Sequence, residues 1–568
     1  MFTNRDAAFF MWVVRRRGGG PSAELRTGGP GAARLAPVAL WLAVLACVGL
    51  YVLFSDLKGI STDEGIRLAA INGNRLFEGD QPGTTARWKD VKSALSTTNY
   101  QPLYYYIQNL VMRIAQSRDP VLLKSVNILF LFGCILVTLR MTVNWPPLAR
   151  WYLVVTTYFS GYLLMHVLQV REYALGLLFL AAVYACTYRL AQRQADPLRA
   201  SDVALYGGYG LLAGAACLNS FWIVPAWAGA AAGLLLLSRR RLPALGRLAI
   251  AGAALVCVLA AIYLVQGFEK KIDVGLWDRN VSLERFARLA AGGFSYIVAG
   301  NDFPQIHVGV PSLGELAEMM AALAVCGGVV GFAAPAVLRA WRAGPLDRFE
   351  VHCVLALAMI AALCLFQTAY FAVRRDALPM WPRYFFQHFW LLHVLMAATV
   401  ARLALSVREG AGSPGRRRLR GAGLAVLLAA GAAWSVKGTL AYYVDPFGDT
   451  GLSKRCEWRT LAPRLRDLAG GDAIVFTRML EAGTISYSAR FLNRLMVWDR
   501  MPRDTAAWPS PLVLVDAKGV SSPQEVLARR AALAEAGFHA LSEQSVDAGP
   551  QPCNLSATVS RFARGGPQ

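Results

Sequence analysis

Long apolar segments alternate with short polar ones along most of the chain. Each apolar segment has about 17–25 residues, the length that a helix needs to cross a hydrocarbon core of about 30 Å. The pattern predicts an all-α, polytopic membrane domain of about eleven transmembrane helices. We expect these helices at 36–54, 120–139, 150–168, 174–190, 203–218, 220–237, 248–266, 313–337, 351–371, 384–404 and 421–441. The two helices around Asn219 and Ser220 have an alternative, a re-entrant hairpin.

The composition agrees with a membrane protein. Hydrophobic residues make up 55% of the 568 residues and charged residues 17%, whereas a soluble protein has about 25% charged residues. The net charge of +22 comes from Arg clusters between the apolar segments, which is typical of membrane topology rather than of nucleic-acid binding. The six histidines are scattered and form no HExxH motif, which argues against a zinc enzyme.

The same charges predict an orientation. If the N-terminus is cytoplasmic, every second loop is cytoplasmic too, and each of these loops is rich in Arg. An odd number of spans then places the C-terminus outside. We expect a disordered cytoplasmic N-terminus at 1–35, the membrane domain at 36–445 and a periplasmic domain at 446–568. Heavy use of Ala, Arg and Gly suggests a GC-rich bacterium, whose inner membrane would hold the protein.

The C-terminal region has a different pattern. Segments 473–477 and 512–516 are apolar and predict buried strands, whereas 458–468 and 524–536 predict helices. Strands that alternate with helices favour a small α/β domain with a parallel sheet.

Two cysteines of this region, Cys456 and Cys553, stand apart from the eight that lie in or beside apolar segments. In an oxidising periplasm we expect them to form a disulfide. The alternative is a pair of unrelated thiols.

Two predicted outer loops, 55–119 and 267–312, are too long for simple connectors, and long loops often carry function. The first contains the acidic pair Asp63 and Glu64, and a carboxylate at this place can accept a proton from an attacking hydroxyl. The alternative is a solvated loop or the start of a short helix.

Further polar residues fall on the same predicted face. Tyr104 and Tyr105 open an amphipathic stretch that we expect at the membrane interface. Arg171, Glu172 and Tyr173 lie between two predicted spans, where ionisable groups are costly and are therefore candidates for function. The alternative is an interfacial Arg that pairs with Glu172 or reaches the lipid headgroups.

Arg383 and Tyr384 enter the tenth predicted span from the outside, within a segment rich in aromatic residues. The arginine offers a planar fork that fits a phosphate. The alternative is an ordinary aromatic belt at the membrane surface.

With these residues in view, the chain resembles membrane glycosyltransferases of the GT-C fold, in particular the superfamily of protein O-mannosyltransferases and aminoarabinose transferases. The acidic pair matches an acidic pair in the first outer loop of that family, and the last segment matches its late Arg-Tyr pair. The middle two segments look like its His-Pro-Pro-Leu-Tyr-Tyr and Ala-Arg-x-Tyr-Ala-Leu motifs. The four segments are Asp63-Glu64, Tyr100-Gln101-Pro102-Leu103-Tyr104-Tyr105, Val170-Arg171-Glu172-Tyr173-Ala174-Leu175 and Arg383-Tyr384.

The chain departs from these motifs in two places. Tyr100 and Gln101 replace the His-Pro of the second segment. Gln169 stands where the family often has a carboxylate, and Glu172 fills a position that is usually neutral. The second carboxylate's role is therefore open, and the sugar or acceptor can differ from the family's.

The resemblance implies an enzyme that takes a sugar from a polyprenyl-phosphate donor and inverts the anomeric carbon. Asp63 would be the general base, Glu64 its support, and Arg171 and Arg383 the groups that bind the donor phosphate. Tyr173 and Tyr384 would orient phosphate or sugar. Further substrate contacts would come from Glu172, Tyr104 and Tyr105. The partners would be membrane lipids and an envelope glycan, lipid or protein as acceptor. No metal is expected, with a divalent cation as the alternative.

Two other classes of function fit the same composition. A transporter or flippase for a lipid-linked or anionic substrate would use ionisable groups inside the membrane and often has internal repeats. A non-catalytic assembly scaffold with a sensing C-terminal domain is the third class. The polar residues lie at the outer edge of the predicted spans and no repeat is visible, which favours the enzyme.

Overall fold

The computed structural model describes residues 30–57, 71, 91–92, 102–117, 120–192, 200–238, 241–266, 281–299, 312–374, 385–409, 413–444, 464–465, 467–477, 495–498, 501–517, 522–547 and 556–565. The chain divides into two compact units at Ala46 and Cys47, so that the helix Pro30–Leu57 (α2) begins in the first unit and ends in the second.

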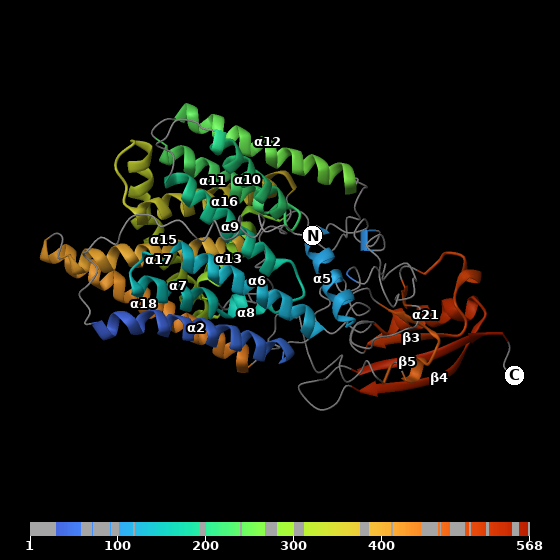
Figure 1. The fold of residues 1–568 in the computed structure, drawn as a ribbon. Coiled ribbons are helices and arrows are strands. Elements are labelled where there is room, and N and C mark those ends of the chain that lie inside the picture. Colours follow the sequence, from blue (N-terminus) through green and yellow to red (C-terminus); the bar gives the residue numbers. More distant parts are fainter. Residues whose placement is uncertain are drawn as a thin grey trace. The chain divides into compact units, whose positions relative to one another are not determined.

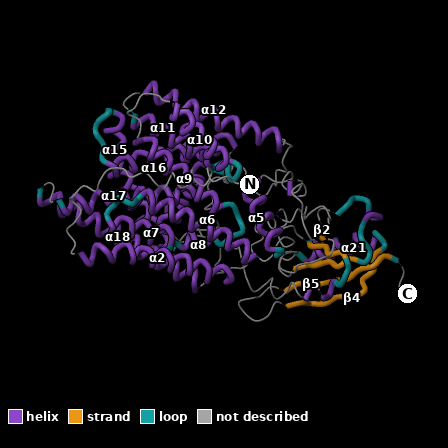
Figure 2. Tube along the Cα trace, in the orientation of Figure 1, coloured by secondary structure: helices purple, strands orange, loops and turns teal. Residues whose placement is uncertain are grey.

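The described residues up to 444 form an all-α domain, and all the described strands follow them (Figures 1 and 2). After α2 come α5 (Pro102–Ala115), α6 (Pro120–Met141), α7 (Pro147–Tyr158), α8 (Gly161–Val167), α9 (Tyr173–Gln192), α10 (Ala200–Cys217), α11 (Ile223–Leu237), α12 (Arg241–Gln266), α13 (Leu283–Ala299), α15 (Leu313–Trp341), α16 (Arg348–Arg374), α17 (Phe386–Arg408) and α18 (Pro414–Val444). Eight of these described helices are long and apolar enough to cross a membrane, namely α2, α6, α9, α12, α15, α16, α17 and α18. The predicted polytopic membrane domain is confirmed.

One predicted span, 150–168, is wrong as a single helix. The chain forms α7 and α8 instead, separated by Phe159 and Ser160. A break in the helical hydrogen bonds inside an apolar domain requires other donors. Thr439 of α18 supplies one, because its hydroxyl donates to the Phe159 carbonyl at 2.5 Å. Gly161 allows this close approach, since a Cβ there would lie 2.5 Å from the Gly438 carbonyl oxygen.

The helices pack through small residues as well as large ones. α6 packs against α9, α10 against α12, α11 against α16, and α17 against α7, α16 and α18. At the crossing of α11 and α16, a Cβ on Gly229 would lie 2.5 Å from the Met359 Cα. Glycine at such a position lets two backbones approach, which is how membrane helices gain contact without a hydrophobic driving force.

The C-terminal part contains one five-stranded sheet. Its strands are β1 (Ala473–Phe476), β2 (Leu495–Val497), β3 (Leu512–Ala517), β4 (Phe538–Asp547) and β5 (Ser556–Arg564), in the order β2-β1-β3-β5-β4. β1 pairs in parallel with β2 and β3, whereas β5 is antiparallel to β3 and β4.

The predicted small α/β domain is confirmed, and its sheet is mixed: the predicted parallel pairing holds for β1 with β2 and β3, whereas β5 adds antiparallel pairs. β1, β3 and the helix α21 (Pro523–Glu535) fall where the sequence places them. The sequence pattern does not predict β4 and β5, and for β4 the reason is that the strand is largely polar and exposed along one edge of the sheet. An edge strand of this kind lacks the apolar run that identifies a buried strand.

Candidate active site

The structure describes five of the residues that the sequence predicts at the site, namely Tyr104, Tyr105, Arg171, Glu172 and Tyr173. The other predicted residues lie outside the described parts of the chain, and their roles stay predictions. They are Asp63, Glu64, Arg383, Tyr384, Cys456 and Cys553.

Arg171 lies in a non-helical turn, residues 168–172, which joins α8 to α9. Its side chain is buried, although Arg is almost never fully buried unless it has partners. Nη1 donates a hydrogen bond to the Tyr173 hydroxyl at 2.7 Å, and the guanidinium carbon lies 5.4 Å from the centre of the same ring. The tyrosine therefore holds the cation through its hydroxyl and through its π face.

Tyr173 belongs to a group of rings from four helices, which we call the aromatic cluster. Its members are Tyr162, His166, Tyr173, Tyr296, Phe386 and Phe389. The Tyr173 ring lies 4.9 Å from that of His166 and 5.3 Å from that of Phe386, measured between centroids. Tyr173 is the partly exposed member and the others are buried. The cluster fixes the ring that holds Arg171.

Phe386 also links Arg171 to another predicted segment. It is the second residue after Tyr384 in the sequence, and it begins α17. The contact between Phe386 and Tyr173 thus joins the segment that follows the late Arg-Tyr pair to the segment that carries Arg171.

Tyr104 and Tyr105 are fully buried inside the protein. The Tyr104 hydroxyl donates to Asn127 Oδ1 at 3.1 Å and accepts from Gln108 Nε2 at 2.9 Å. Both tyrosines share an apolar core with Val170 and Leu175, on either side of Arg171. α5 is amphipathic as predicted, but its tyrosines face the protein because they pack into this core and the Tyr104 hydroxyl finds partners there.

Two asparagines beside Arg171 are absent from the residues that the sequence predicts at the site. Asn127 of α6 donates to the carbonyls of Val167 and Gln169 at 3.1 and 2.6 Å, and Asn219 donates to the Glu172 carbonyl at 3.1 Å. The available signal was a lone amide among apolar residues, in α6 for Asn127 and between α10 and α11 for Asn219, because a polar group at membrane depth is costly unless it has partners.

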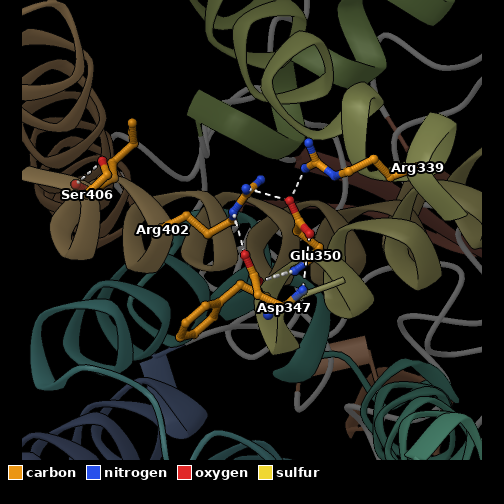
Figure 3. A network of polar contacts seen from close by, with 7 residues as sticks. Arg339, Asp347, Glu350, Arg402 and Ser406 are labelled. Atoms are coloured by element: carbon orange, nitrogen blue, oxygen red, sulfur yellow. Dashed lines mark hydrogen bonds and ion pairs between the residues drawn. The ribbon is translucent and has the colours of Figure 1, made fainter. Parts of the chain in front are cut away.

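A second polar cluster lies at the opposite end of α17, about 24 Å from Phe386 for sixteen helical residues. Arg339 and Arg402 both donate to Glu350 Oε1, the latter at 2.6 Å, and Arg402 Nε lies 3.3 Å from Asp347 Oδ2 (Figure 3). Asp347 also caps the start of α16, accepting from the backbone N–H of Glu350 at 2.8 Å. The predicted inner loops are basic. In this cluster the carboxylates of Asp347 and Glu350 balance the charges of Arg339 and Arg402.

A metal centre would need several ligating side chains close together. In the parts of the chain that the structure describes, three or more His, Cys, Asp or Glu side chains nowhere gather as a metal site.

No protein-family model matches the chain, and no curated protein matches it. Among solved structures, the chain is similar to ArnT from Cupriavidus metallidurans bound to undecaprenyl phosphate, with 13% identity, a TM-score of 0.46, and coverage of 93% of this chain and 99% of that one. It is also similar to the arabinofuranosyltransferase AftD from Mycobacteria, with 14% identity, a TM-score of 0.46, and coverage of 93% and 40%.

A third similar structure is the oligosaccharyltransferase of Archaeoglobus fulgidus in its apo form, with 13% identity and a TM-score of 0.44. The likeness covers 81% of this chain and 64% of that one. Similarities at these scores do not assign a function to the chain.

Proposed function

We propose that the protein is a membrane glycosyltransferase that transfers a sugar from a polyprenyl-phosphate donor to an envelope acceptor on the periplasmic face. One observation carries the proposal: three segments that are far apart in the sequence meet around Arg171. Tyr104 reaches the turn of Arg171 through Asn127, and Phe386 reaches it through Tyr173. These contacts involve two of the four segments that resemble the glycosyltransferase motifs and, through Phe386, the start of the helix two residues after a third.

The surroundings of Arg171 suit a phosphate. A guanidinium can bind a phosphate through two parallel hydrogen bonds, and such charge-assisted bonds are stronger in a dry site than in water. The Tyr173 hydroxyl accepts one N–H of Arg171, which helps to fix the orientation of the planar guanidinium. Rings of the aromatic cluster pack against Tyr173, and the Arg171 side chain beside it is buried.

In the proposed reaction the acceptor hydroxyl attacks the anomeric carbon as the bond to the lipid phosphate breaks, with inversion. Asp63 takes the proton of the hydroxyl, and Glu64 supports Asp63 or holds the acceptor. The leaving phosphate takes the bonding electron pair, and Arg171 and Arg383 stabilise its charge. Tyr173 and Tyr384 orient the phosphate, and Glu172, Tyr104 and Tyr105 line the substrate site or support it.

Radiolabelled sugars on polyprenyl phosphate test the proposal. Membranes that contain the protein are incubated with these donors and with an envelope fraction as acceptor. Incorporation of label into the acceptor supports transfer. Movement of the lipid-linked sugar across the bilayer without covalent attachment would support a transporter instead. If neither transfer nor movement is observed, the result supports a non-catalytic scaffold.

A further inference from the structure

The turn that carries Arg171 lacks the regular backbone hydrogen bonds of a helix. α8 ends at Val167 and α9 begins at Tyr173, so residues 168–172 lie outside the helices. The Arg171 N–H donates to the Gln169 carbonyl at 2.8 Å, rather than four residues back to Val167 as a helix would require. Inside an apolar domain, the carbonyls released in this way need donors from elsewhere in the protein.

Asn127 supplies these donors from one side. Its Nδ2 donates to the carbonyl oxygens of Val167 and Gln169, and its Oδ1 accepts from Tyr104 and from Gln108, at 3.1 and 3.3 Å. A side-chain amide has two donors and two acceptor positions, and Asn127 uses all four. Because the residue is fully buried, no water competes for these bonds.

Asn219 adds a second hydrogen bond on the other side of the turn, where the Glu172 carbonyl also accepts from the Gly176 N–H of α9 at 2.9 Å. Asn219 lies in the connection between α10 and α11, and its Nδ2 donates to the Glu172 carbonyl at 3.1 Å. A Cβ on Gly176 would lie 3.2 Å from this nitrogen, so the glycine leaves room for the amide. The same connection is tied to α5, where the Leu103 N–H donates to the Leu218 carbonyl at 3.0 Å.

We propose that Asn127 and Asn219 are positioning residues that clamp the turn 168–172 and thereby aim the Arg171 guanidinium at the lipid phosphate. This inference rests on the proposed function. Neither amide touches substrate, and both act through the backbone on either side of Arg171. A group displaced by 1 Å can lose about a hundredfold in rate, so a turn without regular hydrogen bonds needs such a clamp.

The test uses the whole protein in nanodiscs with the variants Asn127→Leu and Asn219→Ala, the second of which removes one bond. Thr138→Val is the matched control. Thr138 lies on the same helix as Asn127, is equally buried, and shares a hydrogen bond of 2.7 Å with the Tyr158 hydroxyl, away from the turn. Three quantities are measured: thermal midpoint, amide hydrogen exchange over 166–173, and affinity for undecaprenyl phosphate, with undecaprenol as the lipid without phosphate.

We expect faster exchange over 166–173 and an affinity for undecaprenyl phosphate that falls about tenfold in both asparagine variants. Undecaprenol binding stays unchanged. Thr138→Val changes neither exchange nor affinity, even if its thermal midpoint falls as much as those of the asparagine variants. Wild-type exchange in the asparagine variants, or an equal loss of affinity in Thr138→Val, would overturn the positioning role. Absence of phosphate-dependent binding to the wild-type protein would overturn the proposed function, whereas the exchange data still decide whether the amides clamp the turn.

Discussion

The guanidinium of Arg171 donates to the hydroxyl of Tyr173, 2.7 Å away, although only one residue separates them. In an α-helix, side chains two positions apart point in different directions and do not meet. The contact exists because Arg171 precedes the first residue of α9 and sits in a turn. The shape of this turn therefore decides where the positive charge lies.

Substitution of Arg171 tests whether this charge binds the lipid phosphate. Charge-assisted hydrogen bonds contribute about 1.5–3 kcal/mol, so Arg171→Ala should lower the affinity for undecaprenyl phosphate by roughly ten- to a hundredfold. Arg171→Lys keeps the charge but loses the fork, and should recover only part of the affinity. Binding to the purified protein measures both.

Arg247→Lys is the control for these variants. Arg247 is also buried, but it pairs with Asp202 at 3.4 Å and belongs to the helix α12, whereas Arg171 lies in a turn. Its substitution should leave the affinity unchanged. Equal losses in Arg171→Lys and Arg247→Lys would mean that buried arginines act through stability alone.

Tyr173→Phe separates the hydroxyl from the ring. The variant keeps the contacts with His166 and Phe386 but loses the acceptor for Arg171. A bond to a charged group contributes about 1.5–3 kcal/mol, but this one orients the guanidinium without being the bond to the phosphate, so the affinity should fall by only about two- to tenfold, less than for Arg171→Ala. In the double variant with Arg171→Ala, the second change should cost less affinity than it does alone, and full additivity would show that the two side chains act independently.

Asp63→Asn tests the proposed general base. The amide cannot accept the proton of the acceptor hydroxyl, and loss of a general base slows turnover by about 10²–10⁴-fold. Because the change does not remove the phosphate-binding groups, affinity for undecaprenyl phosphate should stay close to that of the wild-type protein. Rates of sugar transfer in folded protein provide the measurement, and a near-wild-type rate would remove Asp63 from the mechanism.

Glu350→Ala tests the polar cluster at the other end of α17. Glu350 is buried and accepts from both Arg339 and Arg402. Removing one partner of a buried ion pair is strongly destabilising, and because Arg339 is 43% exposed we expect a loss of about 2–3 kcal/mol in unfolding free energy. Lys437→Ala breaks the more exposed pair with Glu318 and should cost about 0–1 kcal/mol. Equal losses in denaturation would contradict a buried cluster.

Gly229→Ala tests the close crossing of α11 and α16. The new methyl would meet the backbone of Met359 at 2.5 Å, so the helices must separate and the thermal midpoint should fall. Gly207→Ala on α10 meets no atom within 4 Å, and should be neutral or stabilising because alanine favours a helix by about 1 kcal/mol over glycine. A stable Gly229→Ala variant would rule out this crossing.

The sequence predicts the long spans because a run of apolar residues as long as the bilayer is thick rarely occurs in a soluble fold. It misses the break between α7 and α8, because Ser160 and Gly161 are residue types that membrane helices also contain, and the bond that permits the break comes from Thr439. A contact between residues 280 positions apart leaves no local signal.

The same limit applies to the candidate site. Arg171 and Tyr173 stand out locally as polar residues between two apolar segments, so pattern alone finds them. Asn127 and Asn219 are single amides among apolar residues, and only their distances to the turn reveal what they hold. Which of these groups meet in space is a property of the fold.

The central claim, that Arg171 binds the phosphate of a polyprenyl carrier, is tested most directly by determining the structure of the protein with undecaprenyl phosphate bound. We predict a phosphate oxygen within hydrogen-bond distance of the Arg171 guanidinium, about 2.7–2.9 Å, beside the Tyr173 hydroxyl. A phosphate bound elsewhere, for example beside Arg339 and Arg402 at the other end of α17, would contradict the claim.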